Sequence, residues 1–157
     1  MRVRRSAAGL ELVDIHPLFS ELLSEVPRAA SRHESARARL YPDPFGGGAD
    51  AEESADWREH VEPELERHFA SSREKVDTDL AASRNSDALR LVIPREHIDD
   101  WLNALNQARL VIVGENDFGE RDLSGAVSPD LSTRRGLSLL KVHFYAHLQE
   151  LLVEAGG

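Results

Sequence analysis

The sequence contains no cysteine, and Met1 carries its only sulfur atom. This absence excludes disulfides, thiolate nucleophiles, thiol redox switches and zinc held by cysteine. The chain also lacks a nucleophile elbow, a dinucleotide fingerprint and a phosphate-binding loop, because Ala49 and Asp50 follow the three glycines at 46–48 where such a loop needs Lys and Ser or Thr. We therefore nominate no catalytic residue and predict a protein that is not an enzyme and uses no cofactor.

Long apolar runs are absent as well. The longest have four residues, as in Leu110–Val113, whereas a membrane helix needs about 18. Three arginines among the first five residues resemble the start of a signal peptide, but Glu11 and Asp14 interrupt the apolar core that such a peptide requires. The sequence predicts no membrane association and a cytoplasmic location.

Positive charge is scarce outside the N-terminal quarter. Residues 1–41 carry seven arginines and five acidic residues, residues 42–157 carry twelve basic and 23 acidic residues, and the net charge is -9. A field of this sign repels phosphate backbones. Arg28, Arg32 and Arg39 form either a solvated helix face or a patch for an anion or partner, and no aromatic residues interleave for base stacking. We do not expect DNA binding, which would be steeply salt-dependent.

The sequence does have the apolar periodicity of helices. Its length and its 41% hydrophobic residues predict a single domain over residues 1–157. The predicted fold is mainly α (α+β), a compact bundle of about five helices with a small antiparallel sheet. An N-terminal hairpin, Arg2–Ser6 with Leu10–Asp14, pairs in this sheet with a strand near residues 88–93. Segments 42–54 and 115–130 are predicted to be mobile loops.

Prolines and capping residues set the expected helix limits. A first helix begins at Pro17, is capped by Asp14 or His16, and is bent or split at Pro27. A second helical segment, 56–83, is divided at a proline. The last helix is expected over 133–155, with Asp130 or Ser132 as its cap, and should pack directly on the helix that precedes it.

That preceding helix, residues 94–114, gives the strongest helix signal in the chain, with Pro94 at its start and Gly114 as its stop. Arg109 lies near the centre of its apolar stripe, where an unpaired guanidinium would cost several kcal/mol. Arg109 therefore needs a partner. The alternatives are an internal ion pair or hydrogen bond, and a carboxylate from a partner protein or small acid. We expect Asn106 and Trp101 to belong to the same network.

Two sets of residues have the spacing of metal ligands. His143, His147 and Glu150 fall on one helix face and would suit zinc or a similar ion. The other interpretation is a polar surface, which we favour because no His-Glu-x-x-His arrangement is present and a fourth ligand must be imported. The second set consists of His60, Glu64 and His68, at successive four-residue steps across a proline.

The order of motifs along the chain resembles a known family. The motifs are Arg4-Arg5, Leu40-Tyr41-Pro42, Trp101-Leu102-x-Ala104-Leu105-Asn106-x-x-Arg109-Leu110 and Tyr145-x-x-Leu148-Gln149-Glu150-x-Leu152-Val153. The resemblance is to an actinobacterial family of unknown function associated with an AosR-like oxidative-stress regulator, whose genes often lie near the adaptor of the Clp protease. It implies regulation, but a thiol-based switch cannot operate in a chain without cysteine.

Our leading hypothesis is a non-enzymatic regulatory or adaptor protein that acts through protein–protein contacts, with the transcription or proteolysis machinery as its expected partner and a homodimer as a second arrangement. The alternative is a metal-binding protein or metal-dependent hydrolase that uses the face formed by His143, His147 and Glu150. The third hypothesis is DNA binding through the N-terminal arginines.

Overall fold

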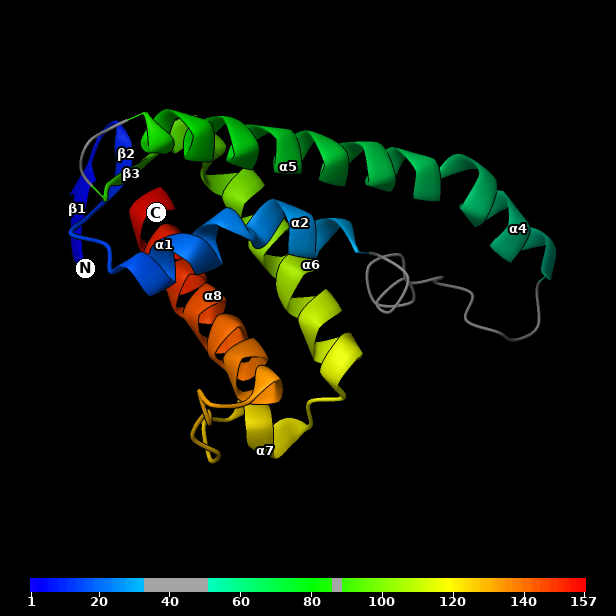
Figure 1. The fold of residues 1–157 in the computed structure, drawn as a ribbon. Coiled ribbons are helices and arrows are strands. Elements are labelled where there is room, and N and C mark those ends of the chain that lie inside the picture. Colours follow the sequence, from blue (N-terminus) through cyan, green and yellow to red (C-terminus); the bar gives the residue numbers. More distant parts are fainter. Residues whose placement is uncertain (33–50, 86–88) are drawn as a thin grey trace.

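The computed structural model describes residues 1–32, 51–85 and 89–157. These residues form a mainly helical fold with one small three-stranded antiparallel sheet, which confirms the predicted fold class (Figure 1). The predicted loop at 42–54 lies outside the described residues as far as residue 50. Residues 51–54 are not a loop, because they form the first turn of helix α4, Ala51–His60.

The sheet has the strand order β1 (Arg2–Ser6), β2 (Gly9–Val13) and β3 (Leu91–Pro94). The alternation that predicted the hairpin is real, since Leu10 and Leu12 are 1% and 0% exposed in the middle strand. Gly9 has a φ of 141°, and a Cβ atom there would lie 2.1 Å from the carbonyl oxygen of Ile93. Only glycine therefore fits at this corner of the sheet.

The first helical segment is divided as predicted, into α1 (Pro17–Ser24) and α2 (Val26–Ser31). His16 is the cap, since its Nδ1 accepts a hydrogen bond of 3.2 Å from the backbone N–H of Leu18. The division falls at Glu25, two residues before Pro27, because proline is tolerated in the first turn of a helix but not in its interior.

Helix α5 (Glu62–Arg84) follows α4 after a single residue, Val61. Figure 1 shows α5 lying along one side of the fold, with α4 at its far end from the sheet. Pro63 falls in the first turn of α5, so the proline begins a helix here as the sequence indicates.

Helix α6 (Ile98–Asn116) packs against α2, α5 and α8 (Arg134–Gly156), so it is the central helix of the fold. The expected packing of the last helix on α6 is confirmed. Gly114 is not the stop, because α6 runs on to Asn116 and ends at Asp117, which adopts the left-handed conformation with φ 50°. A short 3-10 helix, η2 (Arg95–His97), replaces its first predicted turn.

The predicted loop at 115–130 contains the end of α6 and one further short helix, α7 (Glu120–Leu123). The cap of α8 is Thr133, whose hydroxyl accepts a 3.0 Å hydrogen bond from the N–H of Gly136, so the prediction of Asp130 or Ser132 is wrong. A Cβ atom at Gly136 would lie 1.8 Å from the carbonyl oxygen of Asp130. The chain thus folds back tightly on the first turn of α8.

Candidate interaction site

The candidate site lies where α6 meets α8, around the half-buried side chain of Arg109. Its Nη1 donates a hydrogen bond of 2.6 Å to Oε1 of Gln149 on α8. The amide of Gln149 in turn donates from Nε2 to the carbonyl oxygen of Leu102, at 3.3 Å. Arg109 therefore has the partner that the sequence demands, but this partner is neutral.

The charge of Arg109 is not compensated locally. Within residues 1–32, 51–85 and 89–157, no carboxylate lies at ion-pair distance from its guanidinium, and its Nε is buried without an acceptor. Burial lowers the pKa of Arg109, while the more distant charge of Glu150 raises it. Arginine still keeps its proton, so the site holds a partly desolvated cation. A buried donor without an acceptor costs about 1–3 kcal/mol.

His143, a predicted metal ligand, lies on α8 and has an unsatisfied group of its own. It is half-buried, and its Nε2 has no hydrogen-bond partner in the described part of the chain. His147 and Glu150 are exposed and lie 3.6 Å apart between Nδ1 and Oε2. The structure does not bring the ligand atoms of these three predicted metal ligands within 4.8 Å of one another.

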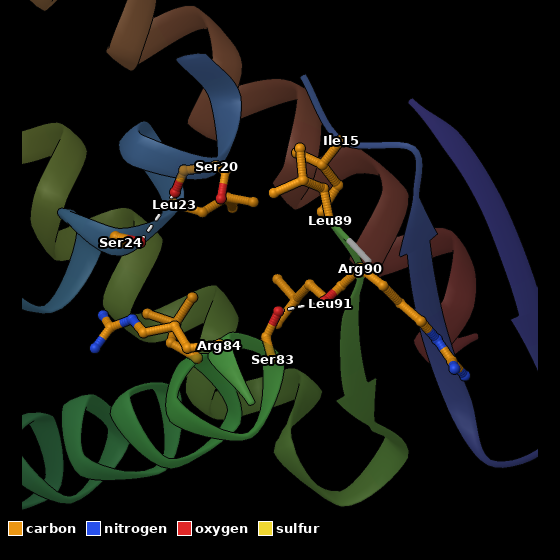
Figure 2. Close-up of a pocket in the computed structure, with 10 residues that line it drawn as sticks. Ile15, Ser20, Leu23, Ser24, Ser83, Arg84, Leu89, Arg90 and Leu91 are labelled. Atoms are coloured by element: carbon orange, nitrogen blue, oxygen red, sulfur yellow. Dashed lines mark hydrogen bonds between the residues drawn. The ribbon is translucent and has the colours of Figure 1, made fainter. Parts of the chain in front are cut away.

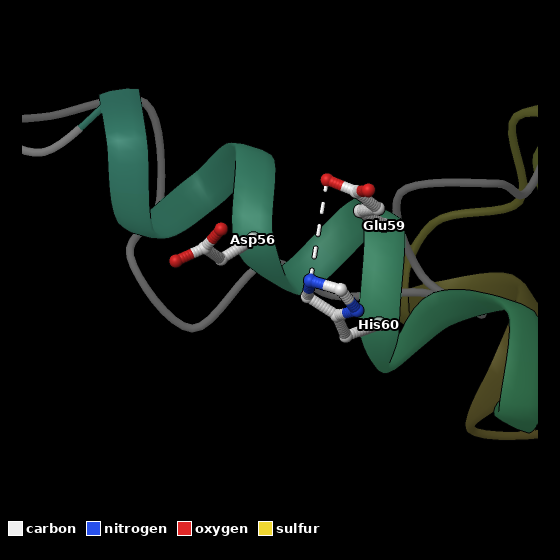
Figure 3. Close-up of side chains that lie close together, drawn as sticks. All are labelled: Asp56, Glu59 and His60. Atoms are coloured by element: carbon white, nitrogen blue, oxygen red, sulfur yellow. Dashed lines mark ion pairs between the residues drawn. The ribbon is translucent and has the colours of Figure 1, made fainter.

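Across the described ranges, the one group of three metal-ligating side chains that does meet this distance consists of Asp56, Glu59 and His60 on α4 (Figure 3). All three are exposed, and Glu59 lies 4.0 Å from the ring of His60. Of the other predicted set, His68 instead contacts Asn103 of α6, at 3.1 Å. A signal was present in the sequence, because residues at i, i+3 and i+4 lie on one face of a helix.

The other two residues that we assigned to the Arg109 network differ in position. Asn106 is exposed, one helical turn before Arg109. Trp101 is 0% exposed and faces α5, where its Nε1 donates a hydrogen bond of 2.9 Å to Oδ2 of Asp79. Arg109 and Trp101 thus occupy two different helix interfaces, and the structure pairs Arg109 with Gln149.

Asp79 is the polar residue that sequence reasoning missed. It is 6% exposed and accepts from Trp101 while its Oδ1 lies 2.9 Å from Nδ1 of His97. A signal was present, since Asp79 falls within the apolar stripe of α5 beside Val76 and Leu80. An aspartate in such a stripe needs hydrogen-bond donors from a neighbouring helix.

A cavity of about 260 Å³ lies between α1, the end of α5 and the residues that lead into β3 (Figure 2). Figure 2 shows Ser20 and Ser24 of α1 across the cavity from Ser83 and Arg84 of α5, with the guanidinium of Arg90 directed away. Among the described residues that line it, none is a carboxylate or a histidine.

None of the helices in the described ranges has the length and apolar character needed to cross a membrane.

Residues 4–156 match the model of a domain of unknown function, DUF2017, so the match covers nearly the whole chain. The protein belongs to this uncharacterised family. The comparison with curated proteins found no match, and the comparison with solved structures found none either.

Proposed function

We propose that this protein is a non-enzymatic regulator or adaptor that binds another protein through the α6–α8 face around Arg109. The observation that carries the proposal is the half-buried guanidinium of Arg109, whose one hydrogen-bond partner among the described residues is the neutral amide of Gln149. A carboxylate from a partner would neutralise this charge and form the stronger, charge-assisted hydrogen bonds that arginine favours. The unsatisfied Nε supplies a donor for it.

The surroundings of Arg109 suit a protein partner. Leu102 of α6, whose carbonyl oxygen accepts from Gln149, is partly exposed, and His143 lies on the same helix as Gln149. Interfaces commonly combine an arginine with apolar contacts that exclude water around it. The whole face is built on two long helices, which hold the guanidinium in place before a partner arrives.

The resemblance to an oxidative-stress regulator family suggests the transcription or proteolysis machinery as the partner and the cytoplasm as the compartment. Without cysteine, such regulation would act through protein contacts rather than through a thiol. A homodimer remains the second arrangement, and sedimentation of the purified chain at several concentrations tests it directly.

The decisive experiment compares partner capture from native lysate by the wild type, Arg109→Met and Arg121→Met. Methionine keeps much of the arginine's length while removing its charge, and Arg121 is an exposed arginine on α7 that serves as the matched control. We expect one or more proteins to be captured by the wild type and the control but not by Arg109→Met. If all three proteins are folded and capture the same partners equally, the proposed role of Arg109 in partner binding is wrong.

Metal binding is the second candidate function, now supported by the group on α4. Metal analysis of the untagged protein, with His60→Ala and His147→Ala alongside, distinguishes the two clusters. A stoichiometric ion lost only in His60→Ala would assign it to Asp56, Glu59 and His60. An ion lost only in His147→Ala would restore the α8 site.

A further inference from the structure

Strand β1 is an open edge of the sheet. Within the described part of the chain it pairs with β2 alone, and all of its residues except Val3 are exposed. Figure 1 shows it at the margin of the fold, on the side away from β3. The edge is five residues long and pairs regularly with β2 from Arg2 to Ser6, without a bulge or a proline. A bulge or a proline commonly prevents an edge strand from pairing with another strand, and β1 has neither.

The register shows which backbone groups of β1 are free. The N–H of Arg95 donates to the carbonyl oxygen of Ala8 at 2.8 Å. Because direction alternates along a strand, Leu10 and Leu12 also turn their N–H and C=O groups toward β3. Pro94 opposite Gly9 fits this register, because proline cannot donate there. The residues of β1 opposite these leucines are Arg5 and Val3. Since successive residues alternate in direction, the N–H and C=O groups of Val3 and Arg5 point outward.

The residues of β1 itself include three arginines and no acid, and the arginines differ in how well they are compensated. Arg2 pairs with Asp14 at 2.6 Å, and Arg5 pairs with Glu154. The charge of Arg4 is less well compensated, because it lies 3.8 Å from Glu11 and shares that carboxylate with Arg90.

These arginines determine which strand can be added. A second copy aligned antiparallel along β1 would bring arginines against arginines, and like charges that face each other across a strand pair are destabilising. A strand with acidic residues would meet opposite charge instead.

We propose that the open edge of β1 binds an extended acidic segment of a partner protein as a fourth strand of the sheet. The backbone groups of Val3 and Arg5 would supply the hydrogen bonds, as in other cases of strand addition. Acidic side chains at alternate positions would lie beside Arg2 and Arg4 on the solvent face. Apolar side chains on the opposite face would lie next to Val3, which packs against the core.

This site is separate from the α6–α8 face, and the proposal does not depend on Arg109. The test uses two synthetic peptides with blocked ends and the length of β1, one alternating Glu with Val and one alternating Lys with Val. Each is titrated into the isotope-labelled full chain and followed through the backbone amide signals.

We expect the Glu peptide to shift the amide signals of Val3 and Arg5 and to slow their hydrogen exchange, while the Lys peptide does neither. Arg4→Glu should weaken the Glu peptide by roughly tenfold and let the Lys peptide bind. Val3→Pro removes an outward N–H without removing a bond between β1 and β2, so it should weaken binding by about fivefold. Arg109→Met should leave the affinity unchanged.

Equal binding of both peptides, or shifts centred on α6 and α8, would overturn the proposal. Dimerisation of the wild type with protected Val3 and Arg5 amides would overturn it too, because a second copy would then occupy the edge. If Val3→Pro disturbs the hairpin, seen as displaced Leu12 signals, the reversal of charge preference in Arg4→Glu decides the outcome alone.

Discussion

The buried polar groups on the two sides of α6 differ in how completely they are hydrogen-bonded. On the α5 side, Asp79 accepts hydrogen bonds from both His97 and Trp101, and Asp100 accepts from Ser72 and pairs with Lys75. On the α8 side, the half-buried guanidinium of Arg109 meets a neutral amide, and within the described ranges its Nε has no partner.

The α5 side has one exception of its own, since Nε2 of Gln107 is unsatisfied although Arg73 donates to the oxygen of the same amide, at 3.0 Å. The difference nevertheless separates two roles for polar residues. Where acceptors and donors match, the network fixes how two helices pack. Where a buried charge has no opposite charge beside it, a partner protein can supply that charge.

The largest effect expected from this comparison is that of Asp79→Ala. The change leaves Nε1 of Trp101 buried without an acceptor and His97 without its carboxylate, so the free energy of unfolding should fall by about 3 kcal/mol. Urea unfolding measures it. Asp77→Ala, at an exposed position of the same helix, is the control and should change stability by less than about 0.5 kcal/mol. Equal losses in both variants would contradict the structural role of the network.

A second prediction concerns the core face of α8, which contrasts with the face that carries Gln149. Tyr145 is 0% exposed and donates from its hydroxyl to the carbonyl oxygen of Leu22, at 2.5 Å. Burial raises the pKa of Tyr145 well above its ordinary value of 10.0, and Glu25 raises it further. Above pH 10 the unfolded chain therefore loses this proton while the folded chain keeps it.

The contribution of Tyr145 to stability is thus constant below its unfolded pKa and declines above it, by about 1.4 kcal/mol between pH 9 and pH 11. Urea unfolding at both pH values measures the decline. Tyr145→Phe lacks the titrating hydroxyl, so its free energy of unfolding should fall by about 1.4 kcal/mol less than that of the wild type between these pH values. The same pH dependence in both proteins would exclude Tyr145 as its source.

The comparison can be sharpened by giving Arg109 a carboxylate. Gln149→Glu would place an acid where the neutral acceptor now lies, but it would also remove the hydrogen bond from Nε2 to the carbonyl oxygen of Leu102. The two effects oppose each other, so stability should stay within about 1 kcal/mol of the wild type at low salt and fall relative to it as salt is added. Thermal unfolding at two salt concentrations measures it. A matched change at the exposed neighbour, Glu150→Gln, should lower stability slightly if its charge acts on Arg109 as proposed.

The smallest effect is expected for Arg109→Met, which removes the uncompensated cation itself. The change removes packing contacts of the side chain, which lowers stability, and it removes the cost of desolvating a charge, which raises stability. These two effects nearly cancel, so the free energy of unfolding should stay within about 1 kcal/mol of the wild type. Urea unfolding beside Asp79→Ala makes the contrast direct. A loss as large as that of Asp79→Ala would show that Arg109 is structural, and the proposed function would fall with it.

Much of this fold could be predicted because local rules agree with tertiary packing. His16 caps α1, Pro27 divides the first helical segment, and the alternation around Leu12 gives the three-stranded sheet. Helix ends were less predictable. Glycine is a common residue at helix ends, so Gly114 was expected to end α6. The helix continues past it, because Asp117 is the residue that adopts the left-handed conformation at its end.

The candidate site could be predicted only in part. The position of Arg109 in an apolar stripe is visible in the sequence, and so is its need for a partner. The identity of that partner depends on how α8 is placed beside α6, which brings Gln149 rather than an acid to the guanidinium.

The tight return of the chain onto the first turn of α8 has a consequence for mutational scanning. Gly136 has no side chain to lose, yet even a methyl group there would collide with the backbone of Asp130. In an alanine scan of this chain, Gly136→Ala should therefore cause one of the larger losses of stability, although the glycine makes no side-chain contact. Among homologues, glycine in that column would mark the chains that start their final helix in this way.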